Sequence, residues 1–433
     1  MGPIVIAVLS FWLRLWHLGT PKGYVFDEVY YAKEAKELLH YGVEVTGSSP
    51  EFIVHPPVGK WCIALGIKFF GNNEFGWRIS SAIVGAITIY LIAQIAQHLF
   101  HSTALSTLAA LLMSLDGLQL VHSRTALLDL FLTFFIVLAL YALLKERYWL
   151  AGIFFGLAIG TKWNGLYYLV AFGPVLLYRD YVRSRMEDGA KFLRTVLKRF
   201  VQFFVLPISV YIASWTGWFL SPRGWDRQWA HTHRSSWSFI PAPLRSLWHY
   251  HAEILNFHTT LTTHHAYQSN PWGWLVMARP TSFFYASPKT CGAKQCAQEV
   301  LALGTPILWW LGTFAIAAVL GFWVKSVAKG ETDKIAGFIL LGIVAGYLPW
   351  FFFQKRTMFS FYAIVFEPFV ILALVYCAKK FLGEEPWSRN RKLLVAFFVL
   401  VIALNFIYFL PIFMGSVISY NSWYHLMWLP SWI

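Results

Sequence analysis

Long runs of apolar residues, separated by short polar connections, make up most of this chain. The first run, 2–18, contains Arg14 and lacks a small-residue cleavage site, so we interpret it as a membrane helix and not as a removed signal peptide. Further runs approach the roughly 20 apolar residues that a membrane-spanning helix needs. They cover residues 78–98, 104–120, 124–144, 148–162, 165–178, 200–220, 300–324, 335–353, 358–378 and 393–413. The pattern predicts an all-α membrane protein with about eleven transmembrane helices.

Two long polar segments interrupt this pattern, at about 20–77 and 221–299. Within the first, residues 27–41 combine helical spacing with a charged face, which predicts a helix lying at the membrane interface. The second is rich in Trp, His, Pro and Ser. We therefore divide one continuous domain into a membrane module at 1–220 that includes the first loop, the loop at 221–299, and a module of about four helices at 300–433.

Composition agrees with a membrane location. Of the 433 residues, 58% are hydrophobic and 13% are charged, whereas ordinary soluble domains have roughly 45–50% and about 25%. The mean hydropathy of +0.53 excludes a soluble globular enzyme and a disordered chain. The net charge is +14, but we find no basic, aromatic-rich soluble segment large enough to hold a nucleic-acid strand. We therefore expect no nucleic-acid partner.

The distribution of basic residues predicts the orientation. If the N-terminus is cytoplasmic, the cytoplasmic connections carry 17 Lys and Arg residues. The short external connections hold only Arg124, Lys162, Lys355 and Arg356. This asymmetry follows the positive-inside rule. We therefore expect both long loops, and the chemistry that they carry, on the external side of the membrane.

Two adjacent carboxylates, Asp27 and Glu28, follow the first predicted helix. Neighbouring positions on a helix point about 100° apart, so one carboxylate can face a cavity while the other orients it. His55 lies in the same loop, before Pro56 and Pro57, which form a rigid turn ahead of a helix. Acids at a helix start also complement the helix dipole, and two prolines also fit a plain helix-start turn. The residues alone leave both interpretations open.

Five cations lie at the external ends of predicted helices, where the orientation rule does not require them. Charges at membrane depth are costly and usually functional, and several at one level can bind a lipid phosphate. For any one of them, the alternative is that the side chain reaches up to the lipid headgroups. The five are Arg78, Arg124, Lys162, Lys355 and Arg356.

Asp129 lies inside a predicted helix, five residues after Arg124. A spacing of three or four residues would suit a direct ion pair better. A buried carboxylate still needs a partner, and we favour a structural role for Asp129 against a neighbouring helix.

Seven of the 14 histidines lie in the second long loop. Their spacing matches no standard zinc pattern and no acid cluster accompanies them, so we predict hydrogen-bonding roles and no metal site. Cys291 and Cys296 also lie in this loop. They are a disulfide candidate that requires an oxidising compartment, and the expected external location favours the bond without deciding it.

These motifs together resemble the bacterial, actinobacterial-type protein O-mannosyltransferases of glycosyltransferase family 39. The resemblance covers essentially the whole chain, and the combination of an Asp-Glu pair with His-Pro-Pro is its most specific part. The motifs are Asp27-Glu28, His55-Pro-Pro-Val-Gly-Lys60, His122-Ser-Arg-Thr-Ala-Leu-Leu-Asp129, Gly160-Thr-Lys-Trp-Asn-Gly165, Arg279-Pro-Thr-Ser-Phe-Phe-Tyr285 and Ala302-Leu-Gly-Thr-Pro-Ile-Leu-Trp309.

The resemblance implies a GT-C type glycosyltransferase in the bacterial plasma membrane, with its active site on the external face. It implies transfer of mannose, with inversion, from polyprenyl-phosphate-mannose to Ser or Thr hydroxyls of exported proteins. The partners are then the lipid-linked donor, the acceptor proteins and the bilayer. No cofactor is required on this account, and the sequence leaves a divalent cation near Asp27 and Glu28 open.

Charge considerations assign the roles. We expect Asp27 to take the proton of the acceptor hydroxyl and Glu28 to orient or bind. One base is enough for a single displacement, because a phosphate leaves without a general acid. Positive groups stabilise the charge that this phosphate gains. We expect them to be Arg78, Arg124, Lys162 and Arg356, with His55 as a further substrate-binding residue.

Two alternatives remain open at this point. The chain could transfer another lipid-linked sugar, or use a lipid acceptor, as the aminoarabinose transferases of lipid A do. Those enzymes usually have Lys-Pro-Pro where this chain has His55-Pro56-Pro57. The second alternative is a transporter of a lipid-linked sugar, a class that often has inverted repeats. No internal repeat is visible in this sequence.

Overall fold

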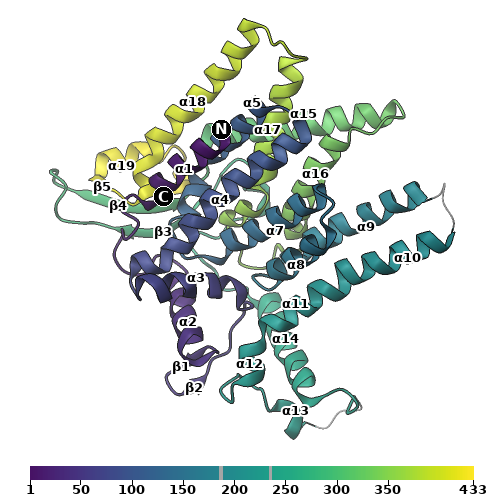
Figure 1. Ribbon diagram of the computed structural model, residues 1–433. Coiled ribbons are helices and arrows are strands. Elements are labelled where there is room, and N and C mark those ends of the chain that lie inside the picture. Colours follow the sequence, from purple (N-terminus) through teal and green to yellow (C-terminus); the bar gives the residue numbers. More distant parts are fainter. Residues whose placement is uncertain (185–188, 234–236) are drawn as a thin grey trace.

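Helices make up most of the computed structural model, which describes residues 1–184, 189–233 and 237–433 (Figure 1). The elements of the first half are α1 (Gly2–Leu15), α2 (Glu28–Tyr41), β1 (Val45–Thr46), β2 (Ser49–Pro50), α3 (Val58–Phe70), α4 (Glu74–Phe100), α5 (Thr103–Ser114), α6 (Gly117–His122), α7 (Leu128–Leu144), α8 (Tyr148–Ile159), α9 (Gly165–Ser184), α10 (Gly189–Phe200), η1 (Val201–Val205), α11 (Leu206–Ser214) and α12 (Thr216–Leu220).

The second half adds the remaining part of the bundle and a small sheet. Its elements are α13 (Trp229–Thr232), α14 (Ala242–Thr260), η2 (Pro271–Gly273), β3 (Thr281–Ala286), β4 (Cys296–Ala302), α15 (Pro306–Ala328), α16 (Lys334–Tyr347), η3 (Leu348–Phe353), η4 (Ser360–Val365), α17 (Glu367–Leu382), α18 (Arg389–Met414), β5 (Val417–Ser419), α19 (Tyr420–Leu426) and η5 (Pro430–Trp432).

The multi-pass membrane character is supported by helix length and composition. Within the described part of the chain, five helices are long and apolar enough to cross a membrane. They are Glu74–Phe100, Leu193–Ser214, Pro306–Ala328, Lys334–Phe353 and Arg389–Met414. Shorter apolar helices such as α1, α7 and α8 accompany them. The expected number of about eleven crossings stays a prediction.

Several predicted helices are interrupted, and their capping residues explain where. The run at 104–120 is two helices, because the Asp116 side chain accepts a hydrogen bond from the Gln119 amide and starts α6 there. The run at 358–378 begins with the short η4, and α17 starts only at Glu367, with a proline in its first turn. The prediction of single helices over these two ranges was therefore wrong.

A small antiparallel sheet, in the order β3-β4-β5, was not expected for an all-α chain. The run predicted as a helix from residue 300 belongs to β4 up to Ala302, and α15 starts at Pro306. Nearly every residue of β4 is buried, so the strand lacks the alternation of apolar and polar residues that would have marked it in the sequence. The helix prediction is wrong at this point for that reason.

The polar segments gather at one end of the bundle. Figure 1 shows α2, β1, β2, α12, α13 and α14 together at the bottom of the view, whereas α15 and α18 extend towards the top. One contact that joins the two long loops is a hydrogen bond in which the Ile53 backbone N–H donates to the Tyr250 hydroxyl oxygen of α14 at 3.0 Å. The two predicted loops are thus in contact with each other at this end of the bundle.

Candidate active site

The first turn of α2 directs Asp27 and Glu28 to different surroundings. Phe26, directly before them, has a φ of +51°, a left-handed conformation that is unusual for a bulky residue. Its ring stacks on Phe283 with centroids 4.8 Å apart and meets Phe361 edge-on at 5.5 Å. Packing across three segments therefore holds this turn.

Asp27 is only partly buried, and its surroundings adjust its proton affinity. Burial raises the pKa of the Asp27 carboxyl to about 6, and the Lys162 charge opposes this shift. The Tyr31 hydroxyl donates a hydrogen bond to Asp27 Oδ2 at 3.4 Å. A carboxylate with a pKa near the working pH is suited to general base catalysis.

Glu28, in contrast, is completely buried and fully hydrogen-bonded. Its two carboxylate oxygens accept from Arg78 Nε and Nη2, both at 2.8 Å. They also accept from the backbone amides of Val25 at 2.8 Å and Ala126 at 2.9 Å. Glu28 thus ties the loop before α2 to α4 and to the segment that leads into α7.

Arg78 and Arg124 are both engaged with the polypeptide itself. Besides Glu28, Arg78 donates to the carbonyl oxygens of Leu18, Pro21 and Gly23. Arg124 donates to three carbonyl oxygens at the end of α1, those of Arg14, Trp16 and His17. Both side chains are buried. Their expected phosphate contacts stay predictions that would require them to leave these partners.

Two of the other predicted cations meet at a cavity of about 120 Å³. Its lining contains two cationic side chains, two histidines and no carboxylate. The lining residues are His55, Lys162, Trp163, Asn164, Tyr167, Leu255, His258, Thr259, Trp350, Phe353, Arg356 and Tyr362. They come from the loop before α3, the α8–α9 connection, α9, α14, η3, the η3–η4 connection and η4, so segments far apart in the chain build this cavity.

Lys162 connects the cavity with the carboxylates around it. Its Nζ lies 2.8 Å from Asp129 Oδ2 and 5.4 Å from the centre of the Tyr362 ring. Asp129 therefore has Lys162 as its partner and not Arg124, and its other oxygen, Oδ1, is buried without a hydrogen bond among the described residues. Asp27 does not line the cavity, but it interacts electrostatically with Lys162.

His55 lies on the opposite wall, where its ring stacks on that of His258 with centroids 5.2 Å apart. The Tyr31 ring, whose hydroxyl contacts Asp27, lies 6.1 Å from the His55 ring. Burial, followed by the charge of Lys162, lowers the pKa of His55 well below its usual value. The imidazole is therefore neutral at physiological pH.

The structure thus brings Asp27, His55, Lys162 and Arg356 to one region, whereas it encloses Arg78 and Arg124 elsewhere. Lys355 is exposed and outside the cavity lining. Sequence reasoning did not assign a site role to Tyr31, His258 or Tyr362. His258 is one of the seven histidines of the second long loop, but nothing in its spacing distinguishes it from the other six.

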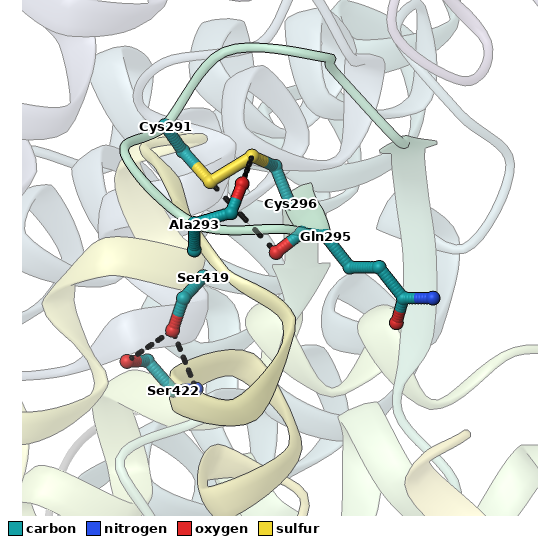
Figure 2. The surroundings of a disulfide bond; sticks show 6 residues. All are labelled: Cys291, Ala293, Gln295, Cys296, Ser419 and Ser422. Carbon is teal, nitrogen blue, oxygen red and sulfur yellow. Dashed lines mark hydrogen bonds between the residues drawn. A yellow bond between two sulfur atoms is a disulfide. The ribbon is translucent and has the colours of Figure 1, made fainter.

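The two loop cysteines, Cys291 and Cys296, form a disulfide, the bond that the expected external location favoured. Figure 2 shows the bond at the end of the β3–β4 hairpin, above the Ser419–Ser422 hydrogen bonds. Cys296 pairs with Ser419 of β5, and the Tyr420 amide donates to the Gln295 carbonyl oxygen at 2.9 Å. The bond therefore closes the hairpin where it contacts the C-terminal segment.

No group of three or more His, Cys, Asp or Glu side chains that could hold a metal ion occurs within the ranges that the structure describes. Asp27 and Glu28 diverge, and Glu28 is saturated by donors. The described side chains therefore do not fit a divalent cation held between these two carboxylates. The metal requirement itself stays a prediction.

Known protein families match both halves of this chain. Residues 4–219 match the family described as dolichyl-phosphate-mannose-protein mannosyltransferase. Residues 243–432 match the C-terminal four TMM region of protein-O-mannosyltransferase.

Relatives and solved structures agree with this assignment. The polyprenol-phosphate-mannose–protein mannosyltransferase of Mycolicibacterium smegmatis is 35% identical to this chain, and the alignment covers 99% of this chain and 92% of that protein. The enzyme of the same name from Mycobacterium tuberculosis is 33% identical, and the alignment covers 99% of this chain and 90% of that protein. The Saccharomyces cerevisiae protein O-mannosyltransferase Pmt1-Pmt2 complex bound to the sugar donor has a TM-score of 0.82 at 16% identity, covering 100% of this chain and 92% of that one. ArnT from Cupriavidus metallidurans bound to undecaprenyl phosphate has a TM-score of 0.52 at 16% identity, covering 94% and 70%. These structures have the expected GT-C fold, and the chain belongs to the protein O-mannosyltransferase family of glycosyltransferases.

Proposed function

We propose that this protein transfers mannose from polyprenyl-phosphate-mannose to Ser or Thr hydroxyls of exported proteins. Family membership and the names of the mycobacterial relatives support the reaction. The observation that carries the proposal is the pairing of a carboxylate of raised pKa, Asp27, with a cavity that has Lys162 and Arg356 in its lining and no carboxylate. The enzyme works in the bacterial plasma membrane with this site on the external face. The excess of Lys and Arg in the connections on the opposite side of the membrane supports this orientation.

Asp27 acts as the general base. The acceptor oxygen attacks the anomeric carbon of mannose, its proton passes to the Asp27 carboxylate, and the bond from that carbon to the phosphate oxygen breaks. The electron pair of the broken bond stays on the polyprenyl phosphate. A single displacement of this kind inverts the sugar carbon. Tyr31 donates to one carboxylate oxygen, which leaves the other oxygen for the acceptor hydroxyl.

Lys162, Arg356 and His55 receive the phosphate. Preorganised donors at the position where charge develops stabilise the transition state, and exclusion of water strengthens their effect. Lys162 connects the two ends of the reaction, because it lines the cavity and its charge also acts on Asp27. Glu28 has a positioning role through Arg78, which keeps Asp27 in its turn at the start of α2.

The direct test is incubation of the purified protein with polyprenyl-phosphate-mannose and a Ser/Thr-rich peptide in detergent. We expect mannosylated peptide from the wild type and almost none from Asp27→Asn. A lipid acceptor and a glucose-charged carrier run beside it to distinguish other transferase activities. Equal rates for wild type and Asp27→Asn would contradict the base assignment. Absence of any transfer, with binding of the donor retained, would favour a transporter.

We further propose that the reaction requires no divalent cation, because cationic side chains can neutralise the phosphate directly. The same assay after exhaustive chelation measures this. Undiminished turnover is expected, and loss of turnover that Mg²⁺ or Mn²⁺ restores would contradict the proposal.

A further inference from the structure

His258, near the end of α14 in the second long loop, contacts two other segments of the chain through its two ring nitrogens. Nε2 lies 2.9 Å from the carbonyl oxygen of Val54. Nδ1 lies 3.1 Å from Nη2 of Arg356. A carbonyl can only accept and a guanidinium can only donate. Nε2 therefore carries the proton, and Nδ1 presents its lone pair to Arg356.

This arrangement requires a neutral imidazole, because an imidazolium has no lone pair for Arg356. Burial and then the Arg356 charge lower the pKa of His258 to about 4, and Lys162 adds to the shift. His55, the other titratable group at this ring, stacks on it and is neutral for the same reasons. The acceptor on Nδ1 is therefore present at every pH at which the enzyme is expected to work.

The position of the ring is firmly determined. The α14 backbone, the bond to Val54 and the stack on His55 hold it, and the Trp163 ring meets it edge-on with centroids 6.1 Å apart. Arg356 is less constrained. Among the described residues, His258 provides the one hydrogen bond that its side chain makes, and Arg356 Nε is buried without a partner.

We propose that His258 is a positioning residue that aims the Arg356 guanidinium at the phosphate of the lipid-linked donor. This inference rests on the proposed function and deepens it. His258 fixes one nitrogen of the guanidinium, and the remaining donors are free for an anion in the cavity. A bond from a neutral ring achieves this without cancelling the charge, whereas a carboxylate at the same position would neutralise Arg356 and repel the phosphate.

Two variants of His258 separate its two hydrogen bonds. His258→Asn retains an acceptor close to the position of Nδ1, and His258→Gln retains a donor close to the position of Nε2. We expect His258→Ala to raise the KM for the donor about tenfold, the size of effect that corresponds to one lost bond to a charged group. Asn should restore most of the affinity, and Gln should restore little. The KM for the peptide should not change.

A double-mutant cycle tests whether His258 acts through Arg356. Donor KM is measured for wild type, His258→Ala, Arg356→Ala and the double variant, and thermal unfolding in detergent is recorded for each. We expect the double variant to equal Arg356→Ala, since an aiming residue has no effect without its target. Multiplicative effects of the two substitutions, or equal rescue by Asn and Gln, would overturn the positioning role while leaving the phosphate role of Arg356 intact. An unchanged donor KM in Arg356→Ala would instead overturn that phosphate role, and the inference with it.

Discussion

Arg78 and Arg356 are the same residue type, and both were predicted at the external boundary of the membrane, yet their surroundings are opposite. Arg78 is completely buried against a carboxylate and three backbone carbonyl oxygens. Arg356 is partly exposed at a cavity, and the bond that the structure gives its side chain goes to a neutral imidazole. The first cation is neutralised and saturated, and the second keeps its charge and spare donors.

The difference distinguishes two uses of charge near a membrane. A buried ion pair contributes little net stability, but removal of one partner is costly because the other is left uncompensated. The Glu28–Arg78 pair is therefore a structural lock that holds the turn before α2. In the Lys162 and Arg356 region, Lys162 has Asp129 as its ion-pair partner, whereas Arg356 contacts no carboxylate among the described residues. The spare donors of both cations and the charge of Arg356 are suited to a phosphate that arrives with the substrate. Three tests separate the lock from the open region, and a fourth examines a feature outside both.

The largest effect is expected at the reacting end of the open region. Asp27→Asn removes the proton acceptor while preserving shape, so kcat should fall by about 10²- to 10⁴-fold. The melting temperature in detergent should hardly change, because Asp27 belongs to no buried ion pair of the described chain. Peptide mannosylation and thermal unfolding measure the two quantities. If kcat falls similarly but the melting temperature also falls strongly, Asp27 has a structural role like that of Glu28 and Arg78.

Breaking the lock should affect folding first. Arg78→Ala leaves Glu28 as an unpaired buried carboxylate, which should lower the free energy of unfolding by about 3–5 kcal/mol. Thermal unfolding and the yield of detergent-soluble protein report this loss. Lys355→Ala is a suitable control, since this exposed cation should affect neither property. If Arg78→Ala is as stable as the wild type but binds the donor more weakly, Arg78 binds the donor phosphate and does not act as a structural lock.

The pH dependence sharpens the assignment of Asp27. The folded protein raises the pKa of its carboxyl to about 6, and the base must be deprotonated to accept a proton. kcat/KM should therefore be nearly constant above pH 7 and fall about tenfold between pH 7 and pH 5. If kcat/KM instead rises as the pH is lowered, the reaction requires a general acid, and the proposed mechanism is contradicted. The profile is measured with short assays so that unfolding does not contribute.

The smallest effect on activity is expected outside both regions. Replacement of Cys291 and Cys296 by Ser opens a short hairpin loop, which should lower the free energy of unfolding by about 2 kcal/mol or less. Donor KM and kcat should remain at wild-type values. A large change in donor KM or kcat would show that the hairpin influences the cavity. The other three tests do not depend on such an influence.

Particular residues indicate how far prediction from sequence extends. The helices α1, α4 and α18 follow from their apolar runs, and Asp27 and His55 from a charged loop with a proline turn. Lys162 and Arg356 were found as cations at an unexpected depth, but by the same signal as Arg78 and Arg124. No local pattern separates the four, because the partners of Arg78 and Arg124 are carbonyl oxygens and one carboxylate of distant segments. Tyr31 and His258 carried no signal of their own.

The sequence by itself determined the membrane location, the family and the residue types available for the chemistry, because hydropathy and motifs are properties of contiguous residues. Only the tertiary structure decided which cations remain open. Whether an arginine is neutralised depends on the groups within about 3 Å of it, the hydrogen-bonding range. Those groups come from residues far away in the chain, 98 positions in the contact between His258 and Arg356 and 110 in the contact between Arg14 and Arg124. Chain folding alone brings such residues together.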